Sequence, residues 1–408
     1  MTNKPVLDRA DARVRHDDSL KGALKDFTDR LRSGDLGMLP VIVGLVLIST
    51  VFSALNPVFL ASNNLVNLLF DCATVGVISL GIVCVLMLGE IDLSVGSMSG
   101  LASAMIGVLW VNAGVSLPLA ILASGALIGA VYATLYNRLG MPSFVSTLSG
   151  LLAILGLQLF LLGPTGSINL PFASPLVGFG QLWILPAWLS YLLGLLPGAV
   201  MLWVGLSVMK QRSAAGLSSQ PLTRLGLKAA ALTVALEGAI YYLHLGRGVP
   251  VMFALFVLLA VILNYALTRT QWGRSMFAVG GNKEAARRSG INVRRIYLSA
   301  FMLCSTLAAL GGILSASRLA SSSQQAGTGD VNLNAIAAAV IGGTSLFGGR
   351  GSAWSAVLGI IVIQAISNGL TLLNLSSSLR YMITGGVLAI AVIVDSLARQ
   401  SRVSHGRG

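Results

Sequence analysis

The sequence predicts an all-α fold, a polytopic helical membrane protein that crosses the bilayer about twelve times. Apolar residues make up 55% of the 408 residues and charged residues only 10%, and the mean hydropathy is +0.83. A water-soluble fold of this length needs far more charge to cover its surface, so the composition excludes a soluble enzyme. The apolar residues also fall into runs of about 20, the length that crosses about 30 Å of hydrocarbon.

The predicted spans follow these runs along the chain. In order they are residues 37–55, 65–88, 95–112, 116–136, 143–162, 182–209, 229–243, 250–268, 296–316, 353–374 and 380–397. The run at 334–347 is shorter and contains two glycines. We expect it to form a half-helix that enters the membrane, and we count it as the twelfth crossing.

Basic residues in the loops predict the orientation of the helices, because Lys and Arg accumulate on the cytoplasmic side. Residues 210–228 carry four basic side chains and residues 269–295 carry seven, whereas residues 163–180 carry no charge. With a cytoplasmic N-terminus, both basic loops are cytoplasmic and 163–180 is periplasmic. The C-terminus is also cytoplasmic if 334–347 crosses. The expected parts are a cytoplasmic tail, a transmembrane domain and a second cytoplasmic tail, at residues 1–36, 37–397 and 398–408.

The formal net charge of +13 does not indicate a nucleic-acid-binding protein, because the basic residues lie in separate loops rather than along one stripe. No catalytic or metal-binding constellation is predicted either. The three histidines lie in the tails or at a loop edge, and the three cysteines lie inside apolar runs without metal-ligand spacing. No GxxxxGK[S/T] phosphate loop is present, so we expect no cofactor on this chain.

A charged segment, GEIDLSVGS at 89–97, interrupts an otherwise apolar stretch. Acids and hydroxyls at membrane depth are tolerated where they line water or cap a helix end. Asp92 precedes the helix start expected near residue 94, so its carboxylate is placed to cap that helix. A cytoplasmic hairpin turn explains the segment equally well. If the segment instead lines a path through the membrane, the residues concerned are Glu90, Asp92, Ser94, Gly96 and Ser97.

A second segment rich in glycine and serine, IGGTSLFGGRGS at 341–352, lies between apolar runs in the C-terminal half. Paired glycine-interrupted segments in the two halves of a transporter indicate its substrate path. This pairing favours a transporter over an inert anchor, although no residue-level repeat links the halves. The path residues expected here are Gly342, Gly343, Thr344 and Ser345.

A third segment, GGNKEAARRSGI at 280–291, lies in the most basic loop and predicts a short helix. Asn282 is a suitable N-cap, Glu284 lies in the first turn, and Gly290 is a suitable stop. The helix is either an ordinary surface helix or a docking helix for a cytoplasmic partner. On the second interpretation the docking residues are Gly281, Asn282, Glu284, Ala285, Ala286, Ser289, Gly290 and Ile291.

Together, the three segments resemble motifs of the permease subunit of bacterial ABC importers for monosaccharides, the ribose, xylose and arabinose group. The family patterns are G-x-I-D-L-S-V-G-S, G-G-N-x-x-A-A-x-x-S-G-I and G-G-T-S-L-x-G-G-x-G-S, and this chain matches each one. The resemblance covers roughly residues 36–397. The chain is most similar to xylose-type members, because it has Glu90 where ribose-type members usually have Gly and an extra region near 182–245.

The resemblance implies a pore-forming inner-membrane subunit that is not an enzyme. It implies three partners: an ABC ATPase that binds ATP and Mg²⁺, a periplasmic sugar-binding protein, and a second permease copy. The implied cargo is a monosaccharide, with D-xylose favoured over ribose. One departure concerns Asn332 and Asn334, where family members usually carry acids, so the charge at these positions is lost.

Two other transport classes stay open on the residues alone. A proton-coupled secondary transporter would use an intramembrane acid as a proton carrier, and the candidates are Asp71, Glu90, Asp92 and Glu237. A passive channel would work without ATP. The punctuated helix at 282–290 favours the ABC class, because a secondary transporter has no need of it.

Overall fold

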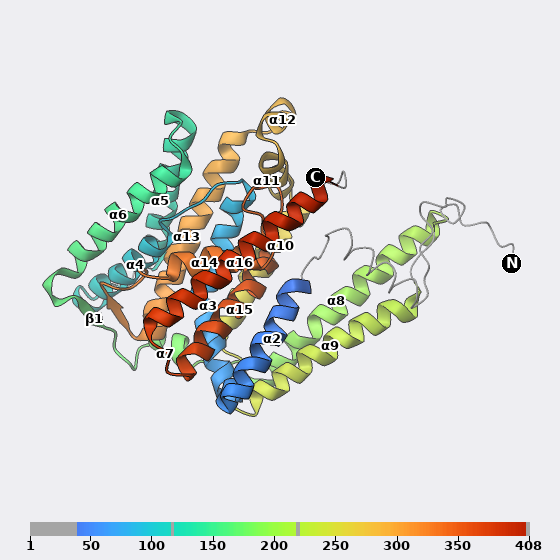
Figure 1. Ribbon diagram of the computed structural model, residues 1–408, viewed down its shortest axis with the longest axis horizontal. Helices are drawn as coiled ribbons and strands as arrows, with labels where there is room; N and C mark the ends of the chain where they lie inside the picture. Colours follow the sequence, from blue (N-terminus) through green and yellow to red (C-terminus); the bar gives the residue numbers. More distant parts are fainter. Residues whose placement is uncertain (1–38, 116–117, 218–220, 405–408) are drawn as a thin grey trace. The chain divides into compact units, whose positions relative to one another are not determined.

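The computed structural model describes residues 39–115, 118–217 and 221–404, which are mainly helical (Figure 1). The tail expected at 1–36 lies outside the described residues, as do residues 405–408. The last helix continues through Ser404, beyond the boundary expected at residue 397.

The helices and strands have these bounds. In chain order the α-helices are α2 (Leu39–Leu55), α3 (Ser62–Met87), α4 (Val95–Ile106), α5 (Pro118–Leu139), α6 (Ser143–Leu162), α7 (Pro175–Gln181), α8 (Ala187–Ala214), α9 (Leu222–His244), α10 (Val251–Arg269), α11 (Gln271–Gly281), α12 (Lys283–Arg288), α13 (Val293–Leu319), α14 (Val331–Ile341), α15 (Ala353–Leu372) and α16 (Ser377–Ser404). The shorter elements are the 3₁₀ turns η2 (Pro57–Leu60) and η4 (Gly163–Thr165), the π-helical segment η3 (Gly107–Asn112), and the paired strands β1 (Ser167–Asn169) and β2 (Ser321–Ser323).

Eight of the described helices are long and apolar enough to cross a membrane: α3, α4 with η3, α5, α6, α8, α10, α13 and α15. Two more, α2 and α14, are apolar but shorter. These helices confirm the predicted polytopic helical fold. The spans expected at 229–243 and 380–397 are helical, as parts of α9 and α16, but neither helix belongs to the set of eight. The count of twelve therefore stays a prediction.

The chain forms two compact units. The first contains Ile184–Val249 together with the last described residues of α16, and the second contains Gly37–Trp183 and Pro250–Leu397. The described middle of the first unit is the hairpin of α8 and α9. Its helices pack closely at Gly198, where an added Cβ would lie 2.0 Å from Thr233 Oγ1.

Two helices, α3 and α13, form the centre of the second unit. The most apolar window of α3 is 83% buried and that of α13 is 67% buried, against 28% for α5, α6 and α10. Helix α13 packs on α3, α4 and α5, while α14 and α15 pack on each other and on α3. The outer helices thus keep apolar faces available for lipid, as membrane-spanning helices require.

The basic loop and the uncharged loop that the charge pattern distinguished lie near different ends of α13. The helix has 27 residues and is therefore about 40 Å long. The basic loop 269–295 leads into its first turn, whereas β2 follows its last turn and pairs with β1 of the uncharged loop 163–180. These two loops therefore lie at opposite ends of α13, as the topology prediction requires.

The chain returns from the β2 end through a broken crossing. Residues 321–330 run beside α4, where Ser322 Oγ donates a hydrogen bond to Ser103 O at 2.5 Å and Gln158 Nε2 donates to Ala326 O at 3.0 Å. Helix α14 then continues, but its 11 residues span only about 17 Å. Of the half-helix expected at 334–347, residues 334–341 are therefore helical, as part of α14, and residues 342–347 are not. That this segment makes the twelfth crossing stays a prediction.

Candidate functional site

The three glycine-rich segments that the sequence singled out meet at one place, which we call the glycine junction and define by Met87, Gly89, Gly280, Gly348 and Gly349. Gly349 N donates a hydrogen bond to Met87 O at 2.9 Å. A Cβ added at Gly280 would lie 1.8 Å from Met87 O, and one added at Gly348 would lie 2.8 Å from Gly280 O. Backbone thus packs directly on backbone, which only glycine allows.

The short helix predicted in the basic loop is present next to this junction as α12. Asn282 Oδ1 accepts a hydrogen bond from Ala285 N at 2.9 Å, so Asn282 is the N-cap that the sequence predicted. Gly290 has a φ of +84°, which suits the predicted stop. Arg287 forms an ion pair with Glu284 at 2.8 Å along the exposed face of the helix.

The expected docking residues on and around α12 differ in their exposure to solvent. Residues 281–285 and 287–290 are exposed, and Ile291 is half-buried. Ala286, by contrast, is only 4% exposed and points into the protein itself. A partner that binds α12 from outside therefore meets Ala285 rather than Ala286, because Ala286 packs the helix onto its own chain.

Lys283, at the start of α12, connects this helix to two tyrosines. Its Nζ donates a hydrogen bond to Tyr136 Oη at 3.1 Å and lies 4.8 Å and 5.1 Å from the ring centroids of Tyr136 and Tyr297. The two rings stack with centroids 4.6 Å apart. The ammonium group is held by a hydrogen bond together with cation–π attraction to two rings.

The same tyrosines hold Glu90. Tyr136 donates to Glu90 Oε1 at 2.6 Å, Ser143 donates to Oε2 at 2.5 Å, and Tyr297 lies 3.4 Å from Oε1. Residues from α5, α6, α12 and α13 therefore converge on the loop between α3 and α4. We call Glu90, Tyr136, Ser143, Lys283 and Tyr297 the Glu90 cluster.

Asp92, two residues later, is fully buried, but it does not cap α4 as the sequence suggested. Its Oδ1 accepts hydrogen bonds from Ser94 N at 2.8 Å and from Ser94 Oγ at 2.7 Å, which form a local turn before the helix. Its Oδ2 has no partner among the described residues. Burial raises the pKa of the Asp92 carboxyl above its ordinary value, although hydrogen bonds from Ser94 and Cys304 oppose this effect.

The free N–H at the start of α4 is satisfied by Asn332 of α14. Asn332 Oδ1 accepts a hydrogen bond from Gly96 N at 2.6 Å, and its Nδ2 donates to Leu93 O. A carboxylate can provide only the first of these bonds, because it has no hydrogen to donate. The amide that departs from the family pattern therefore makes a two-way bridge between the starts of α4 and α14. Asn334 instead donates to Asp330 Oδ2 at 3.0 Å.

Most of the remaining path residues expected from the sequence are buried, but Gly343 is exposed. Ser94, Ser97, Thr344 and Ser345 are all less than 5% exposed. Gly342 packs against α15, where an added Cβ would lie 1.9 Å from Ser355 O.

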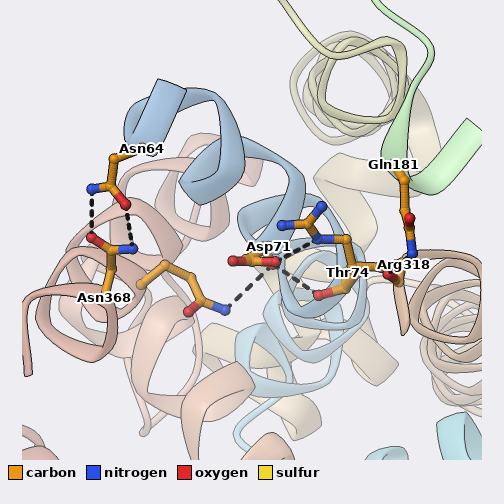
Figure 2. A network of polar contacts seen from close by, with 7 residues as sticks. Asn64, Asp71, Thr74, Gln181, Arg318 and Asn368 are labelled. Atoms are coloured by element: carbon orange, nitrogen blue, oxygen red, sulfur yellow. Dashed lines mark hydrogen bonds and ion pairs between the residues drawn. The ribbon is translucent and has the colours of Figure 1, made fainter. Parts of the chain in front are cut away.

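An ion pair joins α13 to α3, as Figure 2 shows. Arg318 Nε, near the end of α13, donates to Asp71 Oδ1 of α3 at 2.8 Å. The guanidinium group also lies 5.1 Å from the ring centroid of Phe70. The sequence identified Asp71 as an isolated intramembrane acid but did not identify its cation. The sequence does contain one indication of this cation, because Arg318 is the only basic residue between 296 and 349.

The chain matches, over residues 64–392, the model of a family described as the permease component of the branched-chain amino acid transport system. It is 36% identical over 377 residues to the xylose transport system permease protein XylH of Escherichia coli (strain K12), covering 91% of this chain and 94% of that protein.

Two further relatives cover a similar share of the chain. XylH of Haemophilus influenzae is 33% identical over 380 residues, which are 90% of this chain and 98% of that protein. The ribose import permease protein RbsC of Escherichia coli (strain K12) is 31% identical over 359 residues, 87% of this chain and 92% of that protein. No solved structure matches the chain.

Proposed function

Because the chain belongs to the sugar permeases of ABC importers, in the xylose and ribose group, we propose that it carries a pentose into the cell. D-xylose is favoured over ribose as this pentose. Family members are multi-pass inner-membrane transport components rather than enzymes, and such importers include an ATPase and a binding protein. In our proposal two copies of the chain form the path, the partner ATPase binds ATP and Mg²⁺, and both termini are cytoplasmic.

The observation that carries this proposal is the contact between α12 and the Glu90 loop through Lys283. An exposed helix of six residues is too short to be stable alone. Here it is anchored by Ala286 on its inner face and by Lys283 on two tyrosines. A push on α12 by an ATPase therefore acts on residues that also hold Glu90.

The proposed mechanism is a change between two packing arrangements rather than chemistry. Closure of the ATPase displaces α12, and Lys283 moves with it over the stacked rings of Tyr136 and Tyr297. The tyrosines transmit this movement to Glu90, whose loop leads through Asp92 to the start of α4. Because Asn332 ties α4 to α14, both interrupted segments respond together. In this proposal the path residues expected from the sequence lie along these two segments.

Docking is tested by substituting the exposed face of α12. We expect Ala285→Trp to abolish uptake of labelled D-xylose and to weaken co-purification of the ATPase, while the permease still inserts. Ala113→Trp, at an exposed alanine outside this loop, is the matched control. Normal uptake and normal co-purification with Ala285→Trp would refute this docking surface.

Coupling is tested separately with Lys283→Met. We expect the ATPase to co-purify normally, because the substitution leaves most of the exposed face unchanged, but uptake to fall several-fold. Arg288→Met removes a charge from the same helix without a tyrosine contact and serves as the control. Uptake that persists without the ATPase and stops when the proton gradient is dissipated would refute the ABC assignment in favour of a secondary transporter.

A further inference from the structure

A polar pocket of about 130 Å³ lies between α3 and α15 of the second unit. A single water requires roughly 10–15 Å³ by this kind of measure, so the pocket has room for several waters or a small polar ligand. One apolar and five polar side chains line it: Leu68, Asp71, Gln364, Ser367, Asn368 and Thr371. Leu68 is buried, and Thr371 is exposed.

The pocket lies within the membrane-spanning part of α3, towards the end opposite the glycine junction. Asp71 comes nine residues after the first residue of α3 and 16 before the last. At 1.5 Å per residue, it lies about 14 Å from one end of the helix and about 24 Å from the other. Ionisable side chains at such positions are costly and commonly mark substrate pathways.

The polar groups of the pocket keep unused hydrogen-bonding capacity. Asp71 Oδ1 accepts a hydrogen bond from Arg318, whereas Asp71 Oδ2 accepts no hydrogen bond from the described residues. Gln364 Nε2 donates to Asp71 O at 3.3 Å, which leaves its Oε1 available. The hydroxyl of Ser367 also has no partner in the described part of the chain. Reciprocal bonds of 2.8 Å and 3.1 Å with Asn64 fix Asn368 at the pocket edge (Figure 2).

The charge balance of the pocket favours an uncharged ligand. The Asp71 side chain is 43% exposed and Arg318 is 19% exposed, so the pair carries one charge of each sign close to the pocket. A free carboxylate oxygen, an amide oxygen and a hydroxyl together suit a ligand with several adjacent hydroxyl groups, each of which can donate and accept. A single leucine is too little apolar surface for a branched aliphatic side chain.

We propose that this pocket is a transient binding subsite for a monosaccharide during its passage through the permease. Asp71 and Gln364 accept hydrogen bonds from sugar hydroxyls, and Ser367 both donates and accepts. Arg318 is a positioning residue that holds Asp71. This inference rests on the proposed function and specifies where the permease itself contacts the cargo.

The first experiment measures import into proteoliposomes that contain the permease and its ATPase, with the sugar-binding protein and labelled D-xylose outside. We expect Gln364→Leu and Ser367→Ala each to reduce import about threefold to tenfold, the effect of losing one hydrogen bond. The double variant should lose more. Binding-protein-stimulated ATP hydrolysis and ATPase co-purification should stay unchanged. Ser53→Ala is the control, because that hydroxyl bonds only within its own helix, to Thr50 O at 3.1 Å.

The second experiment detects occupancy directly and does not depend on transport. The native cysteines Cys72, Cys84 and Cys304 are buried, so a hydrophilic maleimide should react with a Ser367→Cys variant above a low background. We expect D-xylose to slow this labelling at least twofold, and an equal concentration of a sugar-free osmolyte to leave it unchanged. Wild-type import by the double variant, together with labelling that xylose does not slow, would overturn the subsite. Absence of ATP-driven import by the wild-type complex would refute the proposed function, while xylose protection of Ser367→Cys would still support the pocket.

Discussion

Two carboxylates that lie towards the two ends of α3, Glu90 and Asp71, have different kinds of hydrogen-bond partner. Glu90 accepts hydrogen bonds from neutral hydroxyls of three helices, and Lys283 is linked to it through Tyr136. Asp71 is held by one guanidinium group and keeps an oxygen free. The first arrangement links many elements and engages both carboxylate oxygens, whereas the second links two helices and leaves one oxygen for a ligand. The difference separates a site suited to transmitting movement from one suited to binding cargo.

The largest effect should come from the backbone contact beside Glu90. We expect Gly280→Ala to abolish import, because the new Cβ would lie 1.8 Å from Met87 O and backbone cannot yield as a side chain does. Overpacking of this kind costs about 1–3 kcal/mol or more. Gly156→Ala in α6 is a matched control, since nothing lies within 4 Å of its Cβ. The measurements are import and thermal unfolding of both variants. Equal results for the two would contradict the claim that backbone packing at the glycine junction requires Gly280.

The next largest effect tests the multiple contacts of Glu90. Glu90→Ala leaves the hydroxyls of Tyr136 and Ser143 without an acceptor, so we expect a loss of about 2–4 kcal/mol in the free energy of unfolding. Glu90→Gln keeps one acceptor oxygen and should lose about half as much. Denaturation of the purified permease in detergent measures both. If Gln and Ala were equally damaging, charge rather than hydrogen bonding would explain the role of Glu90.

A smaller effect is expected from the ion pair. Asp71→Asn leaves Arg318 unpaired, and we expect a loss of about 1–3 kcal/mol, between the values for buried and surface pairs, because Asp71 is 43% exposed. Adding Arg318→Met should recover most of the stability but not import, since the free carboxylate oxygen stays absent. Recovery of both by the double variant would mean that the pair serves structure alone.

The smallest effect on import should come from Asp92, a third carboxylate that has neither a cation nor a full set of donors. Its pKa is raised above 3.8 in the folded protein, so the folded state keeps a proton that the unfolded state releases. Stability should therefore fall as the pH rises from about 4 towards the raised pKa.

Asp92→Asn removes this titration, so its melting temperature should change less between about pH 4 and about pH 7. Its uptake should be nearly normal and independent of pH. Loss of uptake in this variant would instead indicate a proton carrier.

The local features of the site could be predicted from the sequence because neighbouring residues determine them. The caps at Asn282 and Gly290 are examples, since each acts within its own helix end. The Asn332–Gly96 bond joins residues 236 positions apart, and the Asp71–Arg318 pair joins residues 247 apart. No spacing rule predicts such contacts.

The role of Ala286 shows the same limit on a smaller scale. The sequence showed that Ala286 is small, but only the packing of α12 shows that the small side chain lets this helix pack on its own chain. Likewise, the acid at position 92 was correctly placed before a helix. The residue that satisfies the helix start comes from α14 because the two broken segments meet in space.

The broken crossing also bears on the order in which the protein is built. An 11-residue helix preceded by irregular backbone has no stable place of its own in lipid. Helix α4 and the residue Gln158, which bind the segment 321–330, are synthesised earlier, so their binding surface is present when that segment leaves the ribosome. We therefore expect membrane insertion of residues 321–341 to be a templated step, in which completed helices accept a segment that cannot enter alone.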